Sequence, residues 1–93
     1  MFTRILRRMQ DNVRRRYYVI THHASREMDE DELTIFDVEC GILTGKIVER
    51  QRDPETKEFK YRIAGKTPEG VRIELIAKIG ATGKLVIITV YVQ

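Results

Sequence analysis

A chain of 93 residues is short for two domains, so we expect residues 1–93 to form one domain around a single core. Apolar residues make up 42% and charged residues 33%, a balance that excludes a long disordered segment. The longest apolar run, residues 85–92, is much shorter than the ~20 residues of a membrane helix.

The cysteine content and the charges near the N-terminus indicate the cellular compartment. Cys40 is the one cysteine, and charged residues interrupt the N-terminal segment where a signal peptide would be apolar. One Cys and two His also argue against a structural zinc site. We therefore expect a cytoplasmic protein without membrane contact, and we predict neither a metal site nor a cofactor.

The net charge of +3 is unevenly distributed along the chain. Residues 1–20 carry six Arg and one Asp, residues 21–45 one Arg and seven acidic residues, and residues 46–93 ten basic and six acidic residues. The basic segments suit a phosphate backbone and the acidic one a basic partner. An ordinary solvated surface explains the same pattern.

Helical periodicity and capping residues predict three helices. The first is amphipathic and basic, within an extension of residues 1–16, with one apolar face made of Phe2, Ile5, Leu6, Met9 and Val13. A short strand over 17–20 follows. Thr21 is placed to cap a helix over 22–28, and Thr34 with Asp37 forms a capping box for a helix ending at Leu43, where Gly45 would adopt the left-handed conformation.

From residue 46 onward, alternating runs separated by turn residues predict four strands joined as hairpins, near 46–52, 58–66, 71–79 and 84–92. The element order is α-β-α-α-β-β-β-β. The predicted class is α+β, with the N-terminal helices packed on one face of a C-terminal antiparallel sheet.

Alternation assigns side chains to the two faces of this sheet. In residues 84–92 strict alternation groups Leu85 and Ile87 with Thr89 and Tyr91, and we expect Thr89 and Tyr91 to lie on the basic face. That face carries Lys60, Arg62, Lys66, Arg72 and Lys78. Cations beside a tyrosine suit single-stranded RNA, whereas a solvated outer face is the plain alternative.

Helical spacing groups His23, Arg26 and Glu27 as i, i+3 and i+4. The imidazole can move protons, the guanidinium can hold phosphate oxygens, and Glu27 can orient the imidazole. These side chains could instead pair with one another, or with the acidic loop 29–32, in a structural role.

Several segments together carry a family pattern. Residues 20–28 read Ile-Thr-His-His-Ala-Ser-Arg-Glu-Met, and an Asp-Val pair begins at Asp37. Gly45 and the strand end over 62–67 follow, and residues 85–91 read Leu-Val-Ile-Ile-Thr-Val-Tyr. Over residues 18–92 this pattern resembles the family named domain of unknown function 4258. The matching positions favour His23 over His22 and include Arg26, Thr89 and Tyr91.

The resemblance implies a RelE/ParE-like fold, with BrnT-like and MqsR-like toxins as neighbours. It also implies an mRNA endoribonuclease toxin, acting on the ribosome or off it, with a cognate antitoxin such as an MqsA-like zinc-finger protein. The expected reaction is metal-independent RNA cleavage, in which His23 moves protons, Arg26 and Arg62 hold phosphate, and Tyr91 stacks on a base or acts as an acid. Lys60, Lys66, Arg72, Lys78 and Thr89 would bind or steer the substrate. The rival hypothesis is a non-catalytic module that binds nucleic acid or a protein partner.

Overall fold

The computed structural model describes residues 2–93 and confirms the predicted element order. Its elements are α1 (Thr3–Arg14), β1 (Tyr18–Ile20), α2 (His22–Glu30), α3 (Ile35–Leu43), β2 (Lys46–Arg52), β3 (Phe59–Lys66), β4 (Arg72–Ile79) and β5 (Leu85–Val92). Each predicted strand boundary in the C-terminal half lies within one residue of the observed one. The α+β class is confirmed. Among the described residues, no helix is long and apolar enough to cross a membrane.

Within residues 2–93, the strands form a five-stranded sheet in the order β1-β5-β4-β3-β2. Strands β2 to β5 are antiparallel neighbours, as predicted. The short strand β1 adds to this sheet in parallel with β5, pairing Tyr18 with Leu85 and Ile20 with Ile87, so the sheet is mixed.

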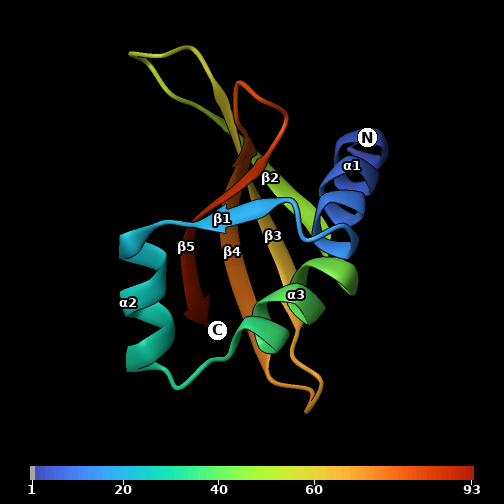
Figure 1. Ribbon diagram of the computed structural model, residues 1–93, viewed down its shortest axis with the longest axis vertical. Coiled ribbons are helices and arrows are strands. Elements are labelled where there is room, and N and C mark those ends of the chain that lie inside the picture. The colour runs from blue at the N-terminus through green and yellow to red at the C-terminus, as the bar shows by residue number, and fades with distance from the viewer. Residues whose placement is uncertain (1) are drawn as a thin grey trace.

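One face of the sheet is covered by helices, and the other is open (Figure 1). Helices α1 and α3 lie across the covered face, and α2 lies beside β5. The core between these layers consists of Met9, Val13, Ala24, Met28, Val38, Ile42, Ile63, Ile73, Leu75, Ala77, Leu85, Ile87 and Val90. The opposite face carries the polar residues of the strands.

Both predicted helix caps are present. The Thr21 hydroxyl accepts a hydrogen bond from the Ala24 N–H, and Thr34 and Asp37 form the complete capping box. The expectation for Gly45 was wrong, because α3 ends without a left-handed residue at that position. Glycine is needed there for space, since a Cβ at residue 45 would lie 2.5 Å from the Gly41 carbonyl oxygen.

The predicted strict alternation of β5 was wrong because the strand contains a β-bulge. Ala77 pairs with Ile87 and Ile76 pairs with Thr89, which leaves Ile88 as an extra residue. Leu85, Ile87 and Val90 are therefore buried in the core. The extra residue directs Thr89 and Tyr91 to the open face, where the sequence had placed them.

Candidate functional site at the edge of the sheet

Helix α2 is attached to β5 just where β1 ends. The Thr21 N–H donates to the Ile87 carbonyl at 3.0 Å, and the Thr21 hydroxyl donates to the Ile88 carbonyl at 3.1 Å. Farther along, the Val90 N–H donates to Glu27 Oε1 at 3.0 Å. The Thr21 N–H and the side chains of Thr21 and Glu27 thus satisfy backbone groups of β5 beyond the three residues of β1.

This attachment places the predicted His23 and Glu27 pair at the edge of the sheet. His23 Nε2 lies 3.4 Å from Glu27 Oε1, the same oxygen that accepts the Val90 N–H. The His23 side chain is 69% exposed, whereas that of Glu27 is 24% exposed. Arg26 is exposed and forms no ion pair with residues 2–93. The imidazole is therefore open to solvent, and its neighbouring carboxylate is fixed to the strand.

The strand register places the other predicted site residues on the open face. Across β3 and β4, Arg62 pairs with Ile76 and Lys66 pairs with Arg72. Across β4 and β5, Thr89 pairs with Ile76 and Tyr91 with Glu74. The strands therefore bring Arg62, Thr89 and Tyr91 into one region and place Lys66 and Arg72 at one end of the face.

A buried carboxylate, Glu74, lies at the centre of this region and is 6% exposed. Arg62 Nη1 donates to both Glu74 oxygens, at 3.0 and 3.1 Å. The Tyr91 hydroxyl donates to Glu74 Oε1, and Gln93 Nε2 donates to Oε2 at 3.1 Å. We call Glu74, Arg62, Tyr91 and Gln93, together with Glu49, the Glu74 network. Glu49 belongs to it because Arg62 Nε donates to Glu49 Oε1 at 3.0 Å.

These hydrogen bonds shift the pKa values of three residues of the Glu74 network. The hydrogen bond from Tyr91, aided by Arg62, lowers the pKa of Glu74, although burial opposes this effect. The bond to Glu74 raises the pKa of Tyr91, and burial adds to it. Hydrogen bonds to Glu49 and Glu74 raise the pKa of Arg62. The network is thus a charged carboxylate held by a neutral phenol and a guanidinium.

These interactions bear on the predicted roles. The Arg62 guanidinium already has two carboxylate partners, and the Tyr91 hydroxyl is engaged with Glu74. Both side chains therefore have part of their hydrogen-bonding capacity taken up within the protein, and both are half-buried. Lys78 is also paired, with its Nζ 3.4 Å from Glu58 Oε1. The geometry therefore favours His23 and Arg26 over Arg62 and Tyr91 as reactive groups.

Sequence reasoning gave no role to the acidic residues of the open face. Glu74 lies two residues from Arg72 and from Ile76 and four from Lys78, so alternation predicts that all four share one face. Its hydrogen-bond partners could not be predicted, because they lie on other segments of the chain. Glu49 joins the network through a bulge in β2 between Ile47 and Glu49. The available signal was that an acidic residue, Glu74, shares the face of the predicted cations and could pair with one of them.

The fold and this site define a small α+β protein with a histidine and glutamate pair at one edge of an open, polar sheet face. Among residues 2–93, no group of three His, Cys, Asp or Glu side chains is arranged to hold a metal ion. The family described as domain of unknown function 4258 (DUF4258) matches residues 20–92, and the chain belongs to it. No curated protein and no solved structure matches the chain.

Proposed function

We propose that this protein is the toxin of a type II toxin-antitoxin system and cleaves mRNA in the cytoplasm without a metal ion. The observation that supports the proposal is the pair of His23 and Glu27, because Glu27 is fixed to the Val90 N–H. Val90 lies between Thr89 and Tyr91, whose side chains face the open side of the sheet. A substrate that crosses this face meets the pair at the edge of β5.

The chemistry follows from the orientation of the imidazole. Because Nε2 faces Glu27, Nδ1 is the nitrogen left to take the proton from a ribose 2′-hydroxyl. The 2′-oxygen then bonds to the adjacent phosphorus, and the bond from phosphorus to the 5′-oxygen breaks. The leaving 5′-oxygen takes a proton from water, which yields a 2′,3′-cyclic phosphate and a 5′-hydroxyl, and the protonated His23 returns its proton to solvent. Arg26, one turn along α2, stabilises the charge on the phosphorane.

The cleavage assay compares four proteins on a long single-stranded RNA in EDTA, with and without ribosomes. These are the native chain, His23→Ala, Arg26→Ala and His22→Ala. His22 is an exposed histidine on the same helix, so His22→Ala is the matched control. We expect cleavage by the native chain and by His22→Ala, and loss of activity in the other two. Equal cleavage by all four proteins would remove the site assignment.

The toxin role has a separate test in cells. Induced expression should stop growth, and co-expression of the adjacent gene, which we propose encodes a zinc-finger antitoxin, should restore it. Growth arrest that His23→Ala leaves unchanged would contradict the assignment of toxicity to this site.

A second function is favoured by the Glu74 network. Because this network neutralises Arg62 and holds the Tyr91 hydroxyl, the open face also suits a non-catalytic module that binds RNA or a protein partner. RNA binding that weakens steeply with salt, together with no cleavage on ribosomes or off them, would favour this function over the first.

A further inference from the structure

The open face carries both paired and unpaired cations. Lys60, near the start of β3, has no ion-pair partner among the described residues. Arg62 and Lys78, toward the middle of the strands, have carboxylate partners. Lys46, Lys66 and Arg72, at the end where β3 finishes and β4 begins, have no ion-pair partner among residues 2–93. Unpaired cations close together repel one another, and an anion between them relieves that repulsion.

The same three side chains line an open hollow of about 630 Å³. The rest of its described lining consists of Thr44, Gly45, Ala64, Gly65 and Gln93, and none of these residues is acidic. The lining thus combines small residues and Gln93 with three long cationic side chains. We call this hollow the Lys46–Lys66–Arg72 pocket.

Hydrogen bonds fix the backbone around this pocket. The Lys66 N–H donates to the Thr44 hydroxyl at 3.1 Å, which ties β3 to the end of α3. Across the strands, Lys66 pairs with Arg72, and the Gln93 N–H donates to the Arg72 carbonyl at 3.0 Å. The backbone positions of Lys66 and Arg72 are therefore set before any ligand arrives.

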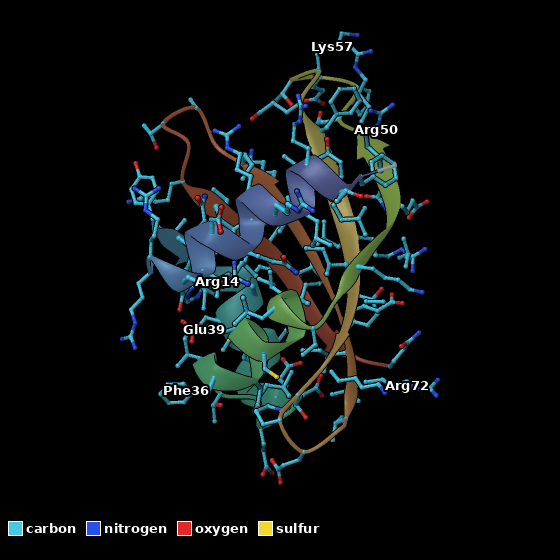
Figure 2. All side chains as sticks on the ribbon, turned by 90° about the vertical axis from the view of Figure 1, so that its right-hand side faces the viewer. Arg14, Phe36, Glu39, Arg50, Lys57 and Arg72 are labelled. Atoms are coloured by element: carbon cyan, nitrogen blue, oxygen red, sulfur yellow. The ribbon has the colours of Figure 1, made fainter. Side chains whose placement is uncertain are left out.

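Glu74 is the acid that could have neutralised the pocket, because it lies two residues from Arg72 on the same face of β4. Both of its oxygens are already occupied by Arg62, Tyr91 and Gln93. Arg72 is left exposed, and it points away from the helices on the open side of the sheet (Figure 2). The carboxylates of the Glu74 network thus offset the positive charge of Arg62 in the middle of the face. Lys46, Lys66 and Arg72 have no such acidic partner at its end.

We propose that the Lys46–Lys66–Arg72 pocket binds a phosphate group, and that this group belongs to the backbone of single-stranded RNA. The phosphate assignment rests on the pocket alone, whereas the RNA assignment rests on the proposed function. Three positive charges match a phosphate, and the Arg72 guanidinium can hold two of its oxygens at once. Lys46 is part of this site although the alternation of the later strands did not select it.

The test compares the native chain with a triple variant, Lys46→Gln/Lys66→Gln/Arg72→Gln. The control, Arg4→Gln/Arg7→Gln/Arg14→Gln, removes the same charge from exposed positions of α1. Inorganic phosphate is titrated first and followed by the backbone NMR shifts of residues 44–46, 64–66 and 72. A fluorescent single-stranded RNA is titrated next over a range of salt concentrations.

For the native chain and the control, we expect phosphate to shift the signals of the pocket residues. For the pocket variant, we expect these shifts to disappear and RNA to bind at least about tenfold more weakly. The log–log slope of affinity against salt should become shallower by about 0.7 for each RNA phosphate that the variant no longer neutralises. Phosphate shifts that persist in the pocket variant would overturn the phosphate site. RNA binding that weakens equally in the control would overturn the RNA assignment.

Loss of the phosphate shifts with unchanged RNA binding would overturn the RNA assignment and leave free phosphate as the ligand. The outcome is independent of the nuclease proposal, because no cleavage is measured.

Discussion

Arg62 Nη1 donates to both carboxylate oxygens of Glu74, at 3.0 and 3.1 Å, from diagonal positions on β3 and β4. Glu74 is 6% exposed and cannot exchange these hydrogen bonds for water without leaving the sheet surface. The pair therefore acts as a structural centre for the open face. It also gives a carboxylate partner to Arg62, one of the two cations that the sequence had assigned to phosphate binding.

Replacing Glu74 should destabilise the protein far more than replacing another paired glutamate of the same surface. In Glu74→Ala, the Arg62 guanidinium and the Tyr91 hydroxyl lose their common acceptor, and we expect a cost of about 2–3 kcal/mol. The control is Glu58→Ala, because Glu58 pairs with Lys78 but is 41% exposed, and we expect less than about 1 kcal/mol. Urea unfolding measures both values. Equal losses in the two variants would contradict the central role of Glu74.

The lowered pKa of Glu74 predicts a specific loss of stability in acid. Its folded value lies below the ordinary 4.5 because Tyr91 and Arg62 stabilise the carboxylate. Below pH 4.5 the unfolded chain takes up this proton first, so the free energy of unfolding falls until the pH has passed the folded pKa. We expect the native chain to lose more stability than Glu74→Gln between about pH 5 and pH 3. Parallel curves for the two proteins would contradict this linkage.

Helix α2 should depend on Glu27 for its attachment to β5. Glu27→Ala removes the acceptor of the Val90 N–H, and for this partly exposed charged hydrogen bond we expect a loss of about 1–2 kcal/mol. Glu30→Ala, an exposed acid of the same helix, should change stability by less than about 0.5 kcal/mol. Hydrogen exchange at Val90 should also accelerate in Glu27→Ala. Unchanged exchange there would show that other interactions hold the helix.

Local patterns were enough to predict most of the fold. The hydroxyl and carboxylate caps at Thr21, Thr34 and Asp37 fixed two helix starts, because capping involves residues three apart in the chain. Alternation predicted the four later strands, and the spacing of His23 and Glu27 predicted their contact. Each of these features depends on neighbours in the sequence.

The remaining features depend on partners far along the chain. Val90 lies 63 residues from Glu27, so no local pattern could reveal that Glu27 binds it. The bulge at Ile88 was invisible because β5 is apolar on both faces, and alternation fails where neither face is polar. The partners of Glu74 come from β3, β5 and the C-terminal residue, and the strand register alone brings them together.

Helix α3 packs closely against β3 beside the Lys46–Lys66–Arg72 pocket. This close packing depends on glycine. A Cβ at Gly65 would lie 1.9 Å from the Gly41 carbonyl oxygen and 2.7 Å from its carbon. Because these are backbone atoms of a packed helix, they cannot move aside as a flexible side chain would. Gly65→Ala should therefore cost about 3 kcal/mol or more, through separation of α3 from β3.

Gly70 provides the matched control for this substitution. It has a φ of +87°, and a Cβ there would meet nothing within 4 Å, so Gly70→Ala suffers only the conformational penalty of about 1 kcal/mol. Urea unfolding measures both costs, and the NMR signals of Thr44 and Lys66 report the packing of α3 against β3. Steric exclusion at Gly65 predicts a clearly larger cost for Gly65→Ala than for Gly70→Ala. Equal costs would contradict the requirement for glycine at the contact between α3 and β3.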